Sequence, residues 1–285
     1  MEGLEAGMGI GMEYGARSDA GRIRENNEDS LCVAPEINLF VLSDGMGGQA
    51  SGEVASHLAT ESIVAHCREA EVNPSLPLIG ERIEGVSDAS NRLASAVRLA
   101  NRVIHEAAEE NAAQRGMGGT VVAVWIAAER VSLAHVGDSR AYRLRGNEFE
   151  QLTRDHSFVA EQVRRGFMSR EEAGTSTLQN VLLRALGVEE EVRVDVDEQL
   201  LMAGDTILLC SDGLTRELSD AQVAAVLGDV EDAQEAADRL VDLANEAGGE
   251  DNISAIVVRH APKPVGTMAR IGRLGRWFKG SEFAS

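Results

Sequence analysis

The chain has 285 residues, of which 44% are hydrophobic, and it carries a formal net charge of −20 at pH 7. That hydrophobic fraction is ordinary for a globular protein with a buried core, and the length suits one large domain or two small ones. The excess of acidic residues would repel a phosphate backbone, so we exclude a nucleic acid as the expected partner.

The first residues and the cysteines bear on where the chain works. Residues 1–10 are predicted to form a flexible N-terminus, because they are rich in glycine and glutamate and lack the basic start and apolar core of a signal peptide. No apolar run approaches the roughly 18 residues that a membrane-spanning helix needs. The 3 cysteines show neither zinc-site spacing nor a disulfide framework, which suits a reducing compartment. We therefore expect a cytoplasmic location.

The first polar segment lies between short strands that are predicted at residues 12–16 and 31–33. It contains Arg24 and the adjacent carboxylates Glu28 and Asp29, and it is too polar for a core element. A solvated loop would explain this composition. The alternative is that Arg24 binds an anion while Glu28 and Asp29 face a cation.

An apolar run at residues 39–42 is typical of a strand buried on both faces, and it ends at Asp44 and Gly45. A carboxylate at the mouth of a buried strand, next to glycines that let another group approach, is suited to hold a hard cation. The arrangement recurs at Asp138 after residues 134–136, at Asp212 after residues 206–210, and at Asp251 before residues 253–258. One Asp-Gly is usually a turn, but four such aspartates indicate a shared site.

Two helices are predicted next, because apolar residues recur at helical spacing over residues 49–69 and 87–114. Prolines in the link between them prevent one continuous helix. Four short strands separated by tight turns are then expected at residues 120–127, 131–136, 139–144 and 148–152. Strands joined by such short turns pair antiparallel.

The segment after these strands is predicted to form a mobile flap, because it is rich in small polar residues and lacks a core of its own. It begins with a helix over residues 155–166, capped by Asp155, and continues through a short helix near residues 169–173. Strands at 192–195, 206–210 and 253–259, with helices at 219–227 and 232–247, complete the expected elements.

The order of these elements predicts the fold class. Strands dominate the beginning, middle and end of the chain, and the helices come in pairs, so the regular alternation of a parallel sheet is missing. We predict an α+β fold in which two packed antiparallel β-sheets are flanked by helix pairs, forming a single catalytic domain over residues 11–260.

Convergence of Asp44, Asp212 and Asp251 at one edge of the sheets would define the chemistry. Carboxylates a few ångströms apart raise one another's pKa unless cations compensate them. Ligation by oxygen alone, without His or Cys, indicates Mg²⁺ or Mn²⁺. Two such ions about 3.5–4 Å apart would lower the pKa of a shared water for in-line attack on phosphorus, and Arg24 would hold the phosphate.

Two other phosphatase patterns are present and are rejected. Cys210 and Arg216 have the spacing of a cysteine-phosphatase loop, but Asp212 lies inside the loop, where it would repel a phosphate and raise the pKa of the thiol. Asp195 and Asp197 have the spacing of an aspartyl-phosphate motif, but the residues that follow do not fit it.

Taken together, the motifs closely resemble those of the metal-dependent Ser/Thr protein phosphatases of type 2C, in their compact bacterial form. The resemblance covers roughly residues 11–260 and rests on seven segments: 18–29, 43–48, 118–120, 136–140, 155–157, 211–214 and 250–252. It implies a sandwich of two antiparallel sheets and a centre with two Mn²⁺ or Mg²⁺ ions, whose bridging hydroxide attacks the phosphorus of phosphoserine or phosphothreonine.

The resemblance also implies roles for individual residues. Asp44 would bridge both ions, Asp212 and Asp251 would complete one of them, and the Gly45 carbonyl would ligate the other. Glu28 and Asp29 would act largely through waters, Asp138 with Asp212 would hold a third, weaker ion, and Arg24 would bind the substrate phosphate. Some relatives carry a His after the Asp-Gly that protonates the leaving alcohol. Met46 stands there in this chain, so the acid must be water or another group, and His156 is the candidate side chain.

Residues 261–285 form a tail with a different composition, in which basic residues alternate with an apolar edge at helical spacing. Such a tail can dock on anionic lipid or on the acidic surface of the protein itself. Its glycines weaken a helix, and residues 280–283 resemble a cloning remnant, so a disordered tail is the other interpretation.

These features predict a bacterial, monomeric phosphoprotein phosphatase that opposes a Ser/Thr kinase. A pseudophosphatase that keeps the fold as a phospho-binding module is the non-enzymatic alternative. Such a protein should lack one of Arg24, Asp44, Asp212 and Asp251, and all four are present. A regulatory phosphatase dedicated to a single partner protein is the second alternative.

Overall fold

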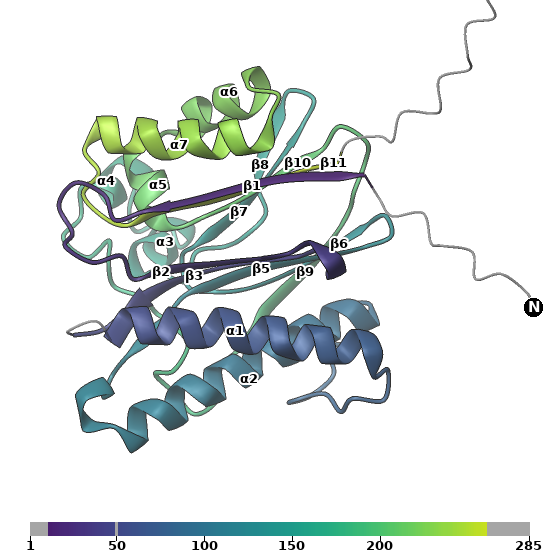
Figure 1. The fold of residues 1–285 in the computed structure, drawn as a ribbon. Helices are drawn as coiled ribbons and strands as arrows, with labels where there is room; N and C mark the ends of the chain where they lie inside the picture. The colour runs from purple at the N-terminus through teal and green to yellow at the C-terminus, as the bar shows by residue number, and fades with distance from the viewer. Residues whose placement is uncertain (1–10, 49–50, 261–285) are drawn as a thin grey trace, which may run out of the picture.

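The computed structural model describes residues 11–48 and 51–260. The predicted flexible N-terminus and the predicted basic tail lie outside these residues. The described chain forms four layers, in which two antiparallel sheets pack face to face and helices cover the outer face of each sheet (Figure 1). The predicted fold class is therefore confirmed. Within the described residues, the helices are too short or too polar to cross a bilayer.

The first sheet has five strands, and α5 (Asp212–Glu217), α6 (Asp220–Asp229) and α7 (Ala233–Ala247) belong to its side of the molecule. Its strands lie in the order β1 (Met12–Asp19), β11 (Ile253–His260), β10 (Thr206–Cys210), β7 (Arg140–Arg145) and β8 (Glu148–Gln151). Each neighbouring pair is antiparallel. The strand at the start of the chain thus lies beside the one at its end.

The second sheet is covered by the long helices α1 (Ser51–Val72) and α2 (Asp88–Glu110). Its main path runs through β2 (Asp29–Ala34), β3 (Leu39–Met46), β5 (Val121–Ala127), β6 (Arg130–Val136) and β9 (Asp195–Leu200). The short strand β4 (Gly118–Gly119) pairs with the end of β3. Single-turn 3₁₀ helices at Pro35–Ile37 and Ala112–Gln114 complete this half.

Strand β3 shows why apolar runs in this sequence become central strands. Successive side chains of a strand point to opposite faces, so Phe40 and Leu42 enter the core between the sheets, whereas Leu39 and Val41 pack against the helices. All four are fully buried, and each contributes roughly 1.5–3 kcal/mol of transfer free energy. This packing holds the strand rigidly up to Asp44, which lies near its end.

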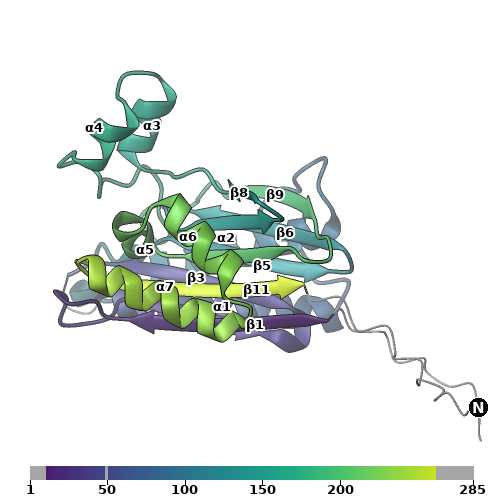
Figure 2. The ribbon, with the colours of Figure 1, turned by 90° about the horizontal axis from the view of Figure 1, so that it is seen from above.

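The flap protrudes from the layered body, as Figure 2 shows for α3 (Phe158–Arg164) and α4 (Arg170–Gly174). The prediction that Asp155 caps the first of these helices is wrong. The Asp155 carboxylate accepts hydrogen bonds from Arg140, so it is not free to cap. Ser157 caps instead, because its hydroxyl accepts a hydrogen bond from the backbone N–H of Ala160.

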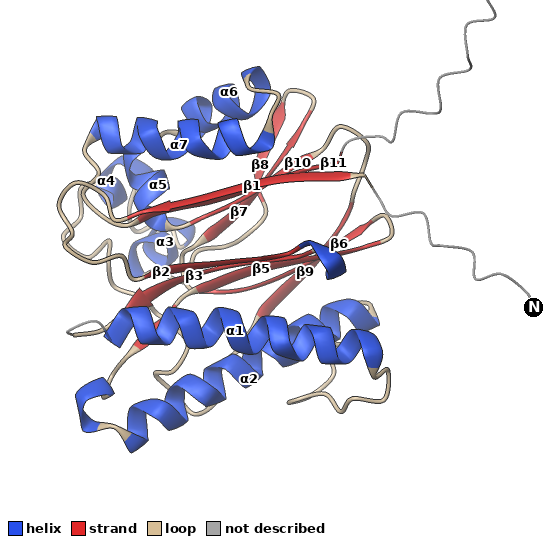
Figure 3. Ribbon diagram, in the orientation of Figure 1, coloured by secondary structure: helices blue, strands red, loops and turns tan. Residues whose placement is uncertain are grey.

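Three further elements differ from the predicted ones. The strand expected at residues 192–195 is instead β9 at Asp195–Leu200. It is an edge strand, and its acidic residues interrupt the apolar run that would have predicted it. No helix was predicted directly after residues 206–210, yet α5 begins there as a separate short helix (Figure 3). The helix predicted to reach residue 114 ends at Glu110 and is followed by a separate 3₁₀ turn.

Candidate metal and phosphate site

A cavity of about 480 Å³ opens at the end of the sandwich where α5 lies. Of the nine residues singled out from the sequence, seven line it: Arg24, Glu28, Asp44, Gly45, Asp138, Asp212 and Asp251. Asn180 and Leu182, which follow α4 in the chain, line it as well. Residues that are up to 227 positions apart in the chain therefore share one polar hollow.

The second sheet supplies Asp44 and Asp29, which are direct partners across β3 and β2. The Asp44 backbone is fixed from the other side, because its N–H donates to Thr120 Oγ1 (3.2 Å) and its carbonyl accepts from Thr120 N–H (2.8 Å). The N–H of Gly45 donates to the carbonyl of Glu28 at 3.0 Å. The end of β3 is thus anchored on both edges.

Gly45 is required by the close approach of α1 to this strand. A Cβ at this position would lie 2.0 Å from the carbonyl oxygen of Gly52 and 2.7 Å from that of Glu28. Both contacts are with backbone atoms, which cannot rotate away. The glycine therefore lets the first turn of α1 pack directly against the strand that carries Asp44.

The first sheet supplies Asp212, the first residue of α5, and Asp251, which lies just before β11. A hydroxyl links the two sheets here, because Ser211 Oγ donates to Asp29 Oδ2 at 2.9 Å. Ser211 Oγ also accepts a hydrogen bond from the N–H of Ser254 at 3.0 Å. The site is therefore built across the seam between the sheets.

Asn252 ties the polar N-terminal segment to this seam. Its amide donates to the carbonyls of Ala20 (3.0 Å) and Asn26 (2.8 Å), and its Oδ1 accepts from the N–H of Glu28 (2.8 Å). We assigned Asn252 no role from the sequence. The sequence signal for such a role was its position directly after Asp251. From that position its side chain holds the loop that carries Arg24 and Glu28.

Burial raises the pKa of the clustered carboxyls. The pKa of Asp44 lies well above its usual range, because the group is desolvated and is surrounded by Asp29, Asp212 and Asp138. Burial raises the pKa of Asp29 and of Asp138 to about 7, and it also raises the pKa of Asp212. The cluster therefore cannot be fully ionised at neutral pH without added positive charge.

This donor set fits small hard cations. The carboxylates converge from two sheets, and the buried Asp29 Oδ1 has no hydrogen-bond partner among the residues that the structure describes. Oxygen ligands of this kind are those that Mg²⁺ and Mn²⁺ prefer.

Two guanidinium groups supply positive charge inside the cavity. Arg24 binds Asp251 through two contacts, Nε to Oδ1 at 2.9 Å and Nη2 to Oδ2 at 3.0 Å. Arg216 binds the same Asp251 Oδ2 at 3.2 Å and also contacts Asp212 Oδ2. The side chain of Arg24 is 52% exposed, so it can also meet an anion that enters from solvent.

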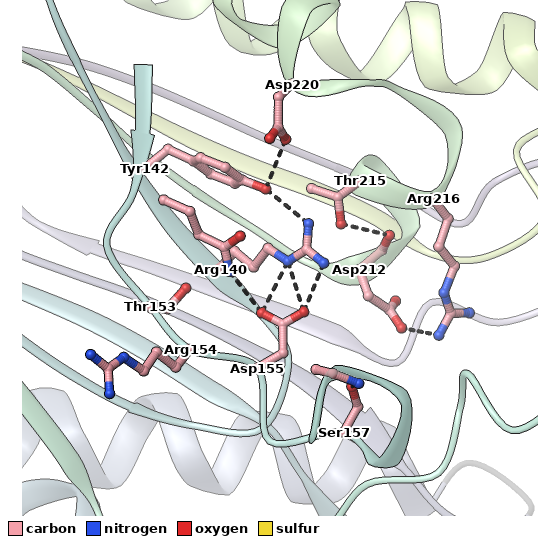
Figure 4. Close-up of polar contacts among 12 residues, drawn as sticks. Arg140, Tyr142, Thr153, Arg154, Asp155, Ser157, Asp212, Thr215, Arg216 and Asp220 are labelled. Atoms are coloured by element: carbon pink, nitrogen blue, oxygen red, sulfur yellow. Dashed lines mark hydrogen bonds and ion pairs between the residues drawn. The ribbon is translucent and has the colours of Figure 1, made fainter. Parts of the chain in front are cut away.

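A different ion pair anchors the base of the flap (Figure 4). Arg140 Nη2 donates to Asp155 Oδ2 at 2.7 Å, and Nε lies 3.0–3.1 Å from both carboxylate oxygens. The remaining Nη1 donates to the hydroxyl of Tyr142 at 2.9 Å. Gln151 adds a hydrogen bond to Asp155 Oδ1 at 2.8 Å. Since Asp155 precedes the flap, this network fixes where the flap leaves the sheet.

His156 does not line the cavity, and its ring is already engaged. Its Nδ1 accepts from the N–H of Gly137 at 3.1 Å, and its Nε2 lies 3.2 Å from Asp195 Oδ2. The ring stacks on His135 with a centroid distance of 4.8 Å. This geometry is that of a packed side chain at the flap base, so the role of His156 as the leaving-group acid stays a prediction that its position outside the cavity lining does not favour.

His135, His156 and Asp195 also form a cluster with metal-ligand spacing, since one ligand atom from each lies within 4.8 Å of the others. Arg184 already places a cation there, with Nη1 at 2.6 Å from Asp195 Oδ1 and 3.1 Å from His156 Nε2. Hydrogen bonds from His156 and Arg184 hold the pKa of Asp195 below its usual range. The cluster is therefore a completed ion pair rather than an open metal site.

Comparison with known proteins identifies the family. A family model described as protein phosphatase 2C matches residues 22–255. The chain is 39% identical over 245 residues to the Listeria innocua protein named Serine/threonine phosphatase stp, which covers 85% of this chain and 93% of that protein.

Solved structures of phosphatases match this chain as well. The crystal structure of the Mycobacterium tuberculosis serine/threonine phosphatase PstP/Ppp matches with a TM-score of 0.77 and 37% identity over 88% of this chain and 99% of that one. A structure of the PstP catalytic domain in complex with two manganese ions matches with a TM-score of 0.75 and 36% identity, over 88% of this chain and 99% of that one. The resemblance that the motifs indicated is confirmed. The chain belongs to the protein phosphatase 2C family and is a phosphatase.

Proposed function

We propose that this protein hydrolyses phosphoserine and phosphothreonine in other proteins, using two divalent cations held in the cavity. The observation that carries the proposal is the convergence of Asp44, Asp212 and Asp251 from both sheets on one cavity that Arg24 also lines. The raised pKa of Asp44 and of Asp212 supports it, because a bound cation would stabilise the ionised forms of these buried, mutually repelling carboxyls.

The residues would divide the ions as follows. Asp44 would contact both Mn²⁺ or Mg²⁺ ions, Asp212 and Asp251 would complete one, the Gly45 carbonyl would ligate the other, and Glu28 and Asp29 would act through waters. Asp138 with Asp212 would take a third, weaker ion. When bound, the ions would neutralise the carboxylates and lower the pKa of a water between them, so that it attacks phosphorus as hydroxide.

Arg24 would bind the phosphate oxygens of the substrate. A guanidinium presents paired N–H donors that match two phosphate oxygens, and Arg24 already uses this geometry on Asp251. Met46 cannot donate a proton, and His156 lies outside the cavity. We infer that water protonates the leaving alkoxide.

We propose that the enzyme acts on phosphoproteins and opposes a bacterial Ser/Thr kinase, because relatives that share most of the chain are named serine/threonine phosphatases. We also propose that it works as a monomer in the cytoplasm. A pseudophosphatase is disfavoured, since Arg24, Asp44, Asp212 and Asp251 all line the cavity.

The test is hydrolysis of a phosphothreonine peptide with Mn²⁺, with and without Asp212→Ala. We expect the variant, and the wild type in excess chelator, to lose activity by a factor on the order of a thousand, because metal stabilisation of the transition state contributes several kcal/mol. Asp229→Asn, at an exposed aspartate outside the cavity, is the matched control and should keep full activity. Turnover by Asp212→Ala, or with chelator, at the wild-type rate would refute the proposal.

A further inference from the structure

Arg216 occupies an unusual position, on the same short helix as Asp212 and one turn after it. Its side chain lines the cavity, and its guanidinium bridges two carboxylates from separate segments, Asp212 on α5 and Asp251 before β11. Figure 4 shows Arg216 turned back toward Asp212. The protein thus carries a tethered cation at the carboxylates that would hold metal.

The contacts fall on the two carboxylates that would hold metal under the proposed function. Arg216 approaches Oδ2 of Asp212 and Oδ2 of Asp251, and Arg24 engages both oxygens of Asp251. A guanidinium has no lone pair to offer, so it cannot join the ligand set of an ion. It also stays charged at every working pH, so it cannot give way by losing a proton.

A metal ion and Arg216 therefore compete for these carboxylates. Mg²⁺ binds carboxylate oxygens at about 2.0–2.1 Å, which would bring the ion into direct repulsion with a guanidinium on the same oxygen. The Arg216 side chain is 28% exposed, so it has solvent to swing into. Displacement is thus feasible, and it opposes metal binding.

We propose that Arg216 is a built-in competitor of the divalent cation, which holds the Asp212 and Asp251 carboxylates together in the metal-free protein and lowers their affinity for metal. The inference rests on the proposed function, since it assumes that these carboxylates bind the ions. The Arg216 guanidinium contacts both carboxylates, so it keeps α5 and the segment before β11 joined until metal arrives. Half-occupancy of the site by metal then needs a higher cation concentration than it would without Arg216.

The test is Mn²⁺ binding to Arg216→Gln, measured by calorimetry and by the electron paramagnetic resonance signal of free Mn²⁺. We expect the variant to bind Mn²⁺ roughly three- to tenfold more tightly, since two partly exposed ion pairs no longer compete. Arg102→Gln removes the same charge from an exposed position on α2 outside the cavity and should leave the affinity unchanged. Arg216→Lys, which keeps the charge without the forked geometry, should lie between wild type and Arg216→Gln.

Thermal denaturation gives a second readout. Without metal, Arg216→Gln should unfold at a lower temperature than wild type, and Mn²⁺ should raise its Tm by more. Equal or weaker Mn²⁺ binding by Arg216→Gln would overturn the inference while leaving the proposed function intact. A wild type that binds no Mn²⁺, with Asp212→Ala no different, would instead overturn the proposed function.

Discussion

Two arginine–aspartate clusters lie near each other in Figure 4 and behave differently. In the closed cluster, Arg140 pairs with Asp155, and its remaining nitrogen reaches Tyr142. In the cavity cluster, Arg216 and Arg24 share Asp251, and Arg216 also contacts Asp212. Arginine and aspartate thus form a fully paired ion pair in the first cluster, whereas in the second the aspartates could exchange an arginine for another cation.

The difference lies in how the partners are matched. Among the described residues, the Asp155 carboxylate pairs with one guanidinium, that of Arg140, and its side chain is 10% exposed, so its charge is neutralised and shielded from solvent. Asp251 is shared by two guanidiniums, while Asp44 and Asp29 beside it have none in the structure as described. A cluster with unequal numbers of charges can accept another ion, whereas a matched pair cannot.

Breaking the closed cluster should have the largest effect on stability. Asp155→Asn leaves the Arg140 charge without its counterion, and we expect the free energy of unfolding to fall by about 3 kcal/mol. Urea denaturation with excess Mn²⁺ measures it. Asp220→Asn, which weakens only a 3.4 Å contact with Tyr142, should change it by less than about 1 kcal/mol. Equal effects of the two variants would show that the closed cluster is not special.

The cavity cluster should instead respond to pH. Burial raises the pKa of Asp29 to about 7, above the value near 3.9 of an unfolded chain. Between these pH values the folded state binds more protons than the unfolded state. The free energy of unfolding therefore falls as pH rises from about 4 to 7. In chelator, the free energy of unfolding of the wild type should fall by roughly 2 kcal/mol more over this pH range than that of Asp29→Asn.

With Mn²⁺ present, stability should instead rise with pH, because metal binding requires ionised carboxylates and releases their protons. Tm measured from pH 4.5 to 7.5, with chelator and with Mn²⁺, separates the two regimes. A chelated wild type whose Tm tracks that of Asp29→Asn at every pH would contradict the burial argument.

The smallest effect is expected at His156, which belongs with the packed flap base. His156→Asn keeps an acceptor for the N–H of Gly137, so we expect kcat to stay within about threefold and stability to fall by about 1 kcal/mol. Loss of a leaving-group acid would lower kcat by about 10²–10⁴. Comparing a phosphothreonine peptide with p-nitrophenyl phosphate is decisive, because only the peptide needs that acid. A selective loss on the peptide would restore His156 as the acid.

Much of the fold could be predicted because central strands carry a local signal. Runs such as residues 39–42 and 206–210 are apolar on both faces, and the structure buries them on both faces. Strand β9 lacks that signal, because an edge strand needs only one buried face and this one is rich in acid. Helix α5 was missed because Asp212-Gly213 is a turn pattern, and only the preceding strand and the packing on α7 make it a helix.

The site divides in the same way. Aspartates at strand ends could be expected to converge, since strand ends gather at the sheet edge, and seven of the nine chosen residues do line one cavity. Their roles as ligands stay predictions. The engagement of Asp251 by Arg216, 35 positions away, depends on the packing of α5 beside β11, which no local pattern encodes. The direction of the His156 ring is set in the same non-local way.

Strand β11 is the last strand of the described chain, yet it lies inside its sheet, between β1 and β10. β1 therefore pairs within its sheet only after β11 has been synthesised, which makes this contact highly non-local. Asp251 lies two residues before β11, so the same late segment also brings this carboxylate to the cavity. We expect a chain that is truncated before Asp251 to lack both the neighbour of β1 and one wall of the cavity, and therefore to be inactive.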